Sequence, residues 1–221
     1  MWLSLAASVA LTAGVTNAPP RFLALGDSYT IGEGVAPNEN WPHQLAAMLR
    51  AQSIAIAEPE IVARTGWTTD ELSATMDVHT FHPPYDLVTL LIGVNNQYRG
   101  RDLENYRVEF RALLERAIAL AGGKPQHVVV VSIPDWGVTR FGVESGRDVA
   151  QIAREIDAFN AVAANVSTAL HARYVDITAI SRTRGNATDM LAADGLHPSA
   201  AMYARWLPAI SMAARASLDG G

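Results

Sequence analysis

The sequence contains no cysteine. This absence excludes disulfide bonds, thiolate metal sites, iron–sulfur clusters and a cysteine nucleophile. Any nucleophile or metal ligand must therefore come from other side chains, among them the six histidines, which are scattered along the chain.

The sequence also has little excess charge. Its 17 Lys and Arg residues are set against 22 Asp and Glu residues, which gives a net charge of −5, and the basic residues form no cluster. Nucleic-acid-binding proteins normally carry a basic patch. We therefore expect no nucleic-acid partner.

A long hydrophobic run is missing as well. The first 18 residues carry no charge and read MWLSLAASVALTAGVTNA, but this stretch is too short to span a bilayer. Thr16 and Ala18 resemble a signal-peptidase site, yet the usual positive charge before the apolar stretch is absent. We expect no stable membrane insertion. For residues 1–20, two interpretations stay open: a cleaved signal peptide of a secreted or periplasmic protein, or an N-terminal extension of a cytoplasmic one.

The length and composition predict one folded domain over residues 21–221. A chain of 221 residues, 49% hydrophobic and 18% charged, can bury a substantial core and is typical of a globular protein. Short apolar runs alternate with longer amphipathic stretches, which is the pattern of βα repeats. The runs are continuous in Val, Ile and Leu, so we expect parallel strands covered on both faces, at residues 22–25, 60–63, 87–92, 127–133 and 173–177.

The intervening stretches place apolar residues at helical spacing. The clearest one begins at Asp102, a favourable N-cap residue, and ends at Gly122 and Gly123. Helices are expected at residues 41–51, 69–76, 102–121 and 147–170, with a last one starting near Pro198, and loops at 93–101, 134–146 and 181–196. Right-handed crossovers between such units build an open, doubly wound α/β sheet.

Ligands of such sheets bind at the carboxyl ends of the strands. Ser28 follows the first strand, Gly66 the second and Asn95 the third, while Asp194 and His197 lie beyond the fifth. These residues therefore meet at one edge of the predicted sheet.

The residues at this edge suit acyl transfer. A serine hydroxyl becomes a good nucleophile when an imidazole takes its proton and a carboxylate orients that imidazole. His197 and Asp194, three residues apart and followed by a proline, fit these two roles on a tight turn. Asp176, directly after the fifth strand, is the alternative acid.

The same edge offers donors for an oxyanion. The backbone N–H groups of Ser28 and Gly66 and the side-chain amide of Asn95 can converge on the oxygen of a tetrahedral intermediate. Taken singly, each residue has an ordinary structural explanation as a turn, a strand end, a loop cap or a helix start. Their combination at one edge favours the catalytic interpretation, and we interpret the remaining histidines as structural: His43, His79, His82, His127 and His171.

Other α/β functions fit less well. Residues 26–34 contain neither the Lys-Ser/Thr of a P-loop nor the glycine spacing of a dinucleotide site. Ser28 also lacks the Gly-x-Ser-x-Gly context of the other large α/β hydrolase fold.

Four sequence blocks together resemble the SGNH, or GDSL, hydrolases. The blocks read Ala-Leu-Gly-Asp-Ser-Tyr-Thr around Ser28, Arg-Thr-Gly-Trp-Thr-Thr around Gly66, Ile-Gly-Val-Asn-Asn around Asn95, and Asp-Gly-Leu-His-Pro-Ser ending after His197. The resemblance extends from about Arg21 to the last helix. It implies a flavodoxin-like, three-layer α/β/α fold with five parallel strands.

The resemblance also implies an activity and a site. Ser28 would be the nucleophile, Asp194 and His197 the other members of the triad, and Ser28, Gly66 and Asn95 the oxyanion hole. Members of the family are esterases, lysophospholipases, thioesterases, arylesterases and carbohydrate deacetylases. They act without a cofactor or a metal.

Two positions depart from the family pattern. Tyr29 stands where the family name has Leu, and we expect this change to affect local packing rather than chemistry. Asn96 stands where the third block often has Asp. The exchange puts in doubt any anchoring of the loop that the acid would provide.

The substrate is the part of the function that the sequence defines least. Trp67, Tyr98, Trp136 and Phe141 lie in or near the strand-end loops and are candidates for a substrate pocket, with packing as the alternative. The segment 134–146 is a candidate specificity loop or lid. Without a large insertion, an accessible cleft for a small ester with a short acyl or aryl group is favoured. Acyl transfer to another acceptor, a carbohydrate- or lipid-binding module without catalysis, and any oligomeric state stay open.

Overall fold

The computed structural model describes residues 18–219. Residues 1–17 of the candidate signal segment or N-terminal extension, predicted over residues 1–20, therefore lie outside the described residues. Between residues 18 and 219, no helix combines the length and the apolar character needed to cross a membrane.

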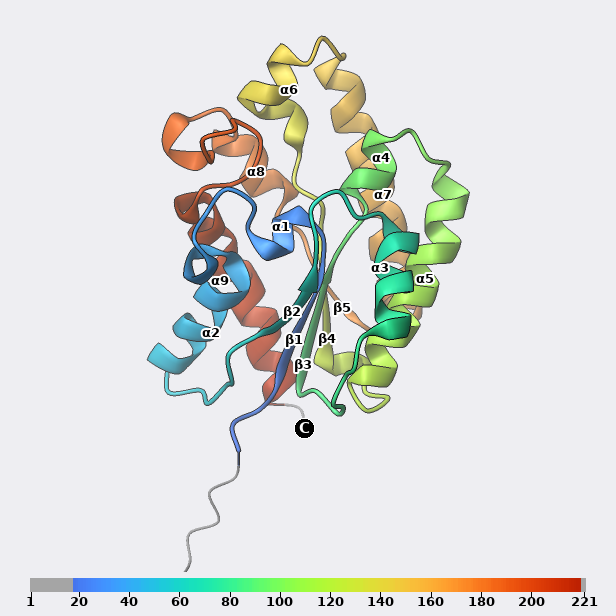
Figure 1. Ribbon diagram of the computed structural model, residues 1–221, viewed down its shortest axis with the longest axis vertical. Helices are drawn as coiled ribbons and strands as arrows, with labels where there is room; N and C mark the ends of the chain where they lie inside the picture. Colours follow the sequence, from blue (N-terminus) through green and yellow to red (C-terminus); the bar gives the residue numbers. More distant parts are fainter. Residues whose placement is uncertain (1–17, 220–221) are drawn as a thin grey trace, which may run out of the picture.

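A five-stranded parallel sheet forms the centre of the described structure (Figure 1). Its strand order is β2-β1-β3-β4-β5, so the chain extends the sheet in one direction and then, after β2, in the other. The switch lies between β1 and β3, where crevices form in such sheets. The strands are β1 (Phe22–Gly26), β2 (Glu60–Ala63), β3 (Leu87–Leu91), β4 (Val128–Val131) and β5 (Arg173–Val175).

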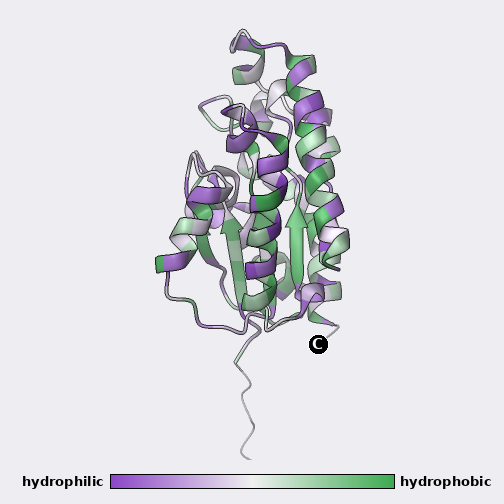
Figure 2. Ribbon diagram, turned by 90° about the vertical axis from the view of Figure 1, so that its right-hand side faces the viewer, coloured by the Kyte–Doolittle hydropathy of each residue, from purple (hydrophilic) through white to green (hydrophobic). Residues whose placement is uncertain are grey.

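Strand burial follows the position in the sheet. The three inner strands, β1, β3 and β4, are buried at every residue, as their continuous apolar sequences predict. The expectation of full burial is wrong for β2 and β5, which are partly exposed because they form the two edges. Figure 2 shows apolar strands enclosed by helices that have both apolar and polar residues.

Helices cover the sheet on both faces (Figure 1). One layer contains α2 (Trp41–Ala51) and α9 (Ala200–Leu218), which pack against each other. The other contains α3 (Thr69–Val78), α5 (Leu103–Leu120) and α7 (Val149–Ala169). This arrangement confirms the predicted three-layer α/β/α fold.

Side-chain caps mark the starts of two helices, at Asp102 as predicted and at Asn40 in addition. The side chain of Asn40 accepts a hydrogen bond from the backbone of His43 at the start of α2, and Asp102 does the same for Asn105 at the start of α5. Such caps satisfy backbone N–H groups that have no partner within the helix. The starts of these helices are therefore encoded locally.

Short helices occupy the segments that follow the strands. They are α1 (Ser28–Ile31), α4 (Val94–Tyr98), α6 (Arg140–Glu144) and α8 (Thr178–Arg184), with 3₁₀ turns at Pro37–Glu39, Pro125–His127, Trp136–Val138 and Thr188–Met190. The expected loops at residues 93–101, 134–146 and 181–196 are therefore partly helical. Figure 1 shows α1, α4, α6 and α8 gathered at the end of the molecule where the strands terminate.

Candidate active site

Ser28 is the first residue of a short helix that follows β1 directly. Asp27 caps this helix, and its Oδ1 atom accepts a hydrogen bond from the backbone N–H of Tyr29 at 3.0 Å. The N–H of a first helical residue has no partner within its own helix. The strand-to-helix turn therefore leaves the backbone N–H of Ser28 available to a ligand, beside the hydroxyl group.

Asp194 and His197 lie on one tight turn before α9. The Oδ2 atom of Asp194 is 2.6 Å from the Nδ1 atom of His197, and its Oδ1 atom accepts from the backbone N–H groups of Leu196 and His197 at 2.9 and 3.0 Å. Gly195 adopts a φ of +71° within this turn, a conformation that suits glycine. The carboxylate thus holds both the turn and the imidazole ring.

The Asp194 carboxyl group has a lowered pKa. Partial burial by itself raises the pKa, but the hydrogen bonds from the His197 ring and from the backbone N–H groups of Leu196 and His197 outweigh that effect. Asp194 is therefore ionised at neutral pH and supplies a negative charge next to the imidazole.

Asp176 makes other contacts. Its Oδ1 atom accepts hydrogen bonds from the Ser132 hydroxyl at 3.1 Å and from the backbone N–H of Thr178 at 2.7 Å. These contacts connect the ends of β4 and β5 and begin α8. Of the two candidate acids, Asp194 is the one bonded to His197.

Gly66 lies in the loop between β2 and α3 with a φ of +86°. Its carbonyl accepts a hydrogen bond from the Nη2 atom of Arg99 at 2.6 Å. Arg99 also pairs with Glu71 at 3.3 Å, and Glu71 in turn accepts from the backbone N–H of Thr68 at 2.9 Å. Arg99 therefore positions the Gly66 turn, a role that carries no local signal in the sequence.

Asn95 projects from α4, which follows β3. The turn before it depends on Gly93, whose φ is +131° and where a Cβ atom would come within 2.7 Å of the Tyr106 ring. The Nδ2 atom of Asn95 donates to the Trp67 carbonyl at 2.9 Å. Because an amide nitrogen carries two hydrogens, one remains for a ligand.

Asn96 is fully buried and joins α4 to α3. Its Oδ1 atom accepts from the backbone N–H of Thr69 at 3.1 Å, and its Nδ2 atom donates to the Thr69 hydroxyl at 2.6 Å. The amide therefore anchors this loop in the absence of the acid that the family often has.

Ser28 and His197 line a common cavity of about 240 Å³ at the ends of the strands. Gly66 and Asn95 line it as well, so the structure brings the five predicted residues to one edge, with Asp194 directly behind His197. The hydrogen bonds of residues 18–219 include none between the Ser28 hydroxyl and His197. Such contacts are often long before a substrate binds.

The cavity lining is mostly apolar. Three of the four predicted pocket residues, Tyr98, Trp136 and Phe141, belong to it, while Trp67 is half-buried against the core and is not part of the lining. Trp67 acts at the site through its backbone carbonyl instead. The lining also contains Tyr29, Thr65, Val94 and Leu196. Each of the four is the sequence neighbour of a predicted site residue, and this adjacency is the signal that could have identified them.

Two buried groups lie directly beside the nucleophile. The Tyr29 ring packs at 5.7 Å from the His197 ring, which confirms a packing role for this departure from the family pattern. Asp27 is fully buried, and its Oδ2 atom has no hydrogen-bond partner in the part of the chain that the structure describes. Burial raises the pKa of Asp27 to about 7, although hydrogen bonds from backbone N–H groups act in the opposite direction.

Across residues 18–219, no group of three or more His, Asp or Glu side chains is placed to hold a metal ion.

Comparisons with known proteins identify the family of the chain. Residues 24–205 match the model of the GDSL-like Lipase/Acylhydrolase family. No curated protein sequence matches the chain.

Solved structures match nearly the whole fold at low sequence identity. TesA is 20% identical with a TM-score of 0.70, and the match covers 90% of this chain and 99% of TesA. The psychrotrophic esterase EstA from Pseudoalteromonas sp. is 18% identical with a TM-score of 0.65, covering 90% and 99%. The acetylxylan esterase Axe2 from Geobacillus stearothermophilus is 19% identical with a TM-score of 0.68, covering 88% and 94%. The three confirm the fold.

Proposed function

The chain belongs to the GDSL-like Lipase/Acylhydrolase family, and from this membership and its site we propose that it is a carboxylic ester hydrolase with one catalytic domain over residues 21–221. The observation that carries the proposal is the 2.6 Å contact between Asp194 and His197 beside a cavity that both His197 and Ser28 line. The substrate is a small ester with a short acyl or aryl group.

The first half of the proposed reaction acylates Ser28. With Nδ1 bonded to Asp194, His197 carries its proton on Nδ1, which leaves Nε2 free to accept the proton of the Ser28 hydroxyl. The Ser28 oxygen attacks the ester carbonyl, and a tetrahedral intermediate forms. His197 then gives its proton to the departing alcohol, and the acyl group remains on Ser28.

The negative charge of the intermediate needs donors that are already in place. The backbone N–H groups of Ser28 and Gly66 and the second hydrogen of the Asn95 amide are proposed to bind this oxygen. Their support comes from fixed partners: Arg99 holds the Gly66 turn and the Trp67 carbonyl holds Asn95. Preorganised donors stabilise the intermediate without reorganisation during the reaction.

The second half returns the free enzyme. Water loses a proton to His197 and attacks the acyl group on Ser28, the same donors bind the oxyanion, and the carboxylic acid leaves as Ser28 regains its proton. These steps use side chains and backbone groups of the protein alone. The proposed reaction therefore needs no cofactor and no metal.

The size and polarity of the cavity support a short acyl or aryl group. Pockets for drug-sized ligands usually measure about 300 to 1,000 Å³, and this cavity is smaller, at about 240 Å³. Tyr98, Trp136, Phe141 and Leu196 give it an apolar wall on which a short alkyl or aromatic group can pack. A long chain would extend beyond it.

The test is release of p-nitrophenol from acetyl, butyryl, octanoyl and palmitoyl esters by the wild type and by Ser28→Ala. We expect kcat/KM to fall with chain length in the wild type and turnover to be nearly abolished in Ser28→Ala. Equal activity of the two proteins would overturn the role of Ser28. Preference for palmitate would overturn the short-chain substrate.

The same acyl-enzyme could pass its acyl group to an alcohol or an amine. Adding such an acceptor to the p-nitrophenyl acetate reaction separates the two outcomes. Both release p-nitrophenol, but hydrolysis converts the acetyl group to acetate whereas transfer yields the acetylated acceptor. We expect acetate to be the main product.

A further inference from the structure

Tyr98 separates two hollows at the strand-end edge. The inner one is the cavity of about 240 Å³ next to Ser28 and His197, and the outer one is an open cleft of about 570 Å³ between the end of α4 and the start of α7. Of the residues between 18 and 219, Tyr98 alone lines both. Tyr98 therefore lies at the boundary of the two hollows, and we call it the wall between them.

The Tyr98 ring contacts Trp136, which is itself held by hydrogen bonds. Trp136, which is 2% exposed, donates a hydrogen bond from Nε1 to Gln97 at 2.8 Å, and Gln97 donates to Glu155 on α7 at 2.7 Å. These two hydrogen bonds connect the indole ring to α4 and α7. Trp136 is thus held firmly within the inner cavity.

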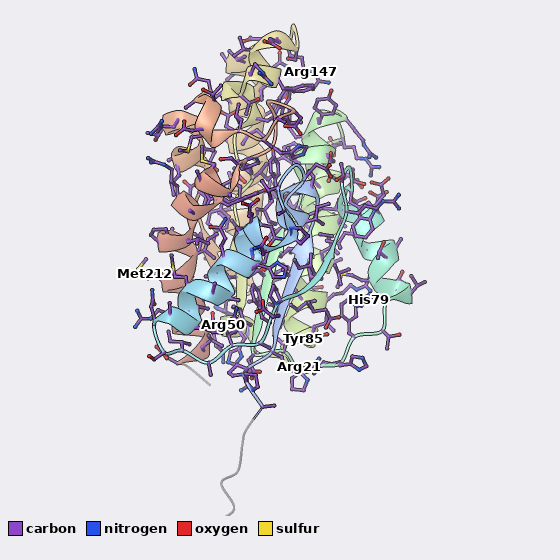
Figure 3. The ribbon with its side chains drawn as sticks, turned by 60° about the vertical axis from the view of Figure 1, so that its left-hand side comes forward. Arg21, Arg50, His79, Tyr85, Arg147 and Met212 are labelled. Atoms are coloured by element: carbon purple, nitrogen blue, oxygen red, sulfur yellow. The ribbon has the colours of Figure 1, made fainter. Side chains whose placement is uncertain are left out.

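Tyr98 itself is held more weakly, from the outside. It is 41% exposed and meets Trp136 edge to face, with ring centroids 5.4 Å apart. The Arg147 guanidinium lies 4.4 Å from the centre of the Tyr98 ring and donates to the Tyr98 carbonyl at 3.0 Å. Figure 3 shows Arg147 at the end of the molecule, in the segment between α6 and α7. The exposed Arg147 thus holds Tyr98 through its ring and its carbonyl.

We propose that Tyr98 limits the length of the acyl group and that Arg147 is the positioning residue that keeps Tyr98 in place. This inference rests on the proposed ester hydrolysis and specifies its substrate. An acyl chain longer than the inner cavity meets the Tyr98 ring. Without that ring, the chain continues into the outer cleft, where Ile152 and the alkyl parts of Gln151 and Arg147 offer apolar surface.

The test measures kcat and KM for p-nitrophenyl acetate and octanoate and compares the ratio of the two kcat/KM values, octanoate over acetate. We expect Tyr98→Ala to raise this ratio about tenfold, since tenfold corresponds to about 1.4 kcal/mol and to the burial of about two further methylene groups. The change should appear mainly in KM for octanoate.

Arg147→Ala provides the second arm. It keeps the Tyr98 ring but removes the guanidinium that holds it, so the octanoate-to-acetate ratio should rise severalfold, less than in Tyr98→Ala. In the double variant, Arg147→Ala should raise the ratio no further than Tyr98→Ala does alone, because Arg147 acts on the ratio by holding Tyr98. Additive effects in the double variant would overturn the positioning role.

Two controls complete the set. Tyr98→Phe keeps the ring that contacts Trp136 and Arg147, so its ratio should stay within about twofold of the wild type. Arg111→Ala removes an exposed arginine of α5 that pairs with Glu115 and lines neither hollow, so it should leave activity and ratio unchanged.

The outcomes separate the inference from the proposed function. If the wild type hydrolyses acetate and Ser28→Ala does not, the function stands whatever the ratios are. Unchanged ratios in both Tyr98→Ala and Arg147→Ala would then overturn the proposed role of Tyr98 in limiting the acyl group, while the proposed ester hydrolysis would stand. If Tyr98→Ala does not fold, the Arg147→Ala variant tests the proposal alone: a severalfold rise of its ratio supports the role of Tyr98, and an unchanged ratio overturns it. If the wild type hydrolyses neither ester, the proposed function fails first.

Discussion

The side-chain amide of Asn95 donates a hydrogen bond to the backbone carbonyl of Trp67, with 2.9 Å between the two atoms. This contact connects the segment after β3 to the segment after β2. Because Gly66 directly precedes Trp67, it also connects two of the three proposed oxyanion donors. The donors Gly66 and Asn95, which follow different strands, are therefore positioned relative to each other before any substrate binds.

Asn95→Ala should impair catalysis much more than folding. Loss of one oxyanion donor lowers kcat by about 10² to 10³, whereas loss of the hydrogen bond to Trp67 costs about 1 kcal/mol of stability. The measurements are kcat on p-nitrophenyl acetate and urea unfolding. A wild-type rate in this variant would mean that Asn95 only caps the loop.

Asp194→Asn tests the acid. The variant amide oxygen can still accept from the backbone of Leu196 and His197, but the NH₂ group faces Nδ1 of His197 and donates to it. The imidazole then carries its proton on Nε2 and cannot accept the proton of Ser28. We expect kcat to fall about 10⁴-fold with the fold intact.

The matched control for this variant is Asp176→Asn. Asp176 bonds to Ser132 and Thr178 rather than to His197, so its replacement should leave kcat near the wild-type value. The reverse result, a loss of activity in Asp176→Asn alone, would assign the acid to Asp176.

The parts of the fold with a repeating or local signal were predictable. The expected boundaries of β2 and α2 match the observed ones, and Asp102 caps α5 as expected. The position of the site followed from topology, because a parallel sheet collects the residues after its strands at one edge. The tight turn of Asp194 and His197 was predictable from their spacing and the following proline.

The parts determined by contacts between distant residues were not predictable. Helices α4 and α6 are five residues long, too short to show an apolar period, so they were expected as loops. Arg99 reaches Gly66 across 33 positions of the chain, and Arg147 reaches Tyr98 across 49. Trp67 was expected in the pocket because it is aromatic, but its side chain packs on the core.

Arg99→Ala tests one of these distant contacts. Without the hydrogen bond to its carbonyl, the Gly66 turn gains freedom, and its N–H group is less well placed for the oxyanion. Because small misplacements of catalytic groups are costly, we expect kcat on acetate to fall about tenfold. Arg99→Lys keeps one donor toward Gly66 and should recover part of the loss.

Arg101→Ala is the control for Arg99. Arg101 pairs with Asp70 at the start of α3, at 2.6 Å, and does not contact Gly66. Its replacement should leave kcat unchanged. An equal loss in the two variants would indicate a general loosening of α3 instead of an effect on Gly66.

Asp27 gives the protein a stability that depends on pH. Its pKa is about 7 in the folded protein and 3.8 in the absence of structure, so the folded state binds the proton more tightly. The stabilising effect of that proton is complete below about pH 4 and is lost as the pH rises to about 7. Over this interval the Asp27 carboxyl group lowers the free energy of unfolding, by at most about 4 kcal/mol.

Asp27→Asn should remove this pH dependence. The amide oxygen can keep the hydrogen bond from the Tyr29 backbone, and the NH₂ group is neutral at every pH. In urea unfolding at pH 5 and pH 8, the variant should therefore gain stability relative to the wild type at pH 8. Ser28→Ala changes the neighbouring side chain but keeps the carboxyl group, so its pH dependence should follow that of the wild type. If the free energies of unfolding of Asp27→Asn and the wild type differ by the same amount at both pH values, Asp27 does not titrate between them, and the prediction is wrong.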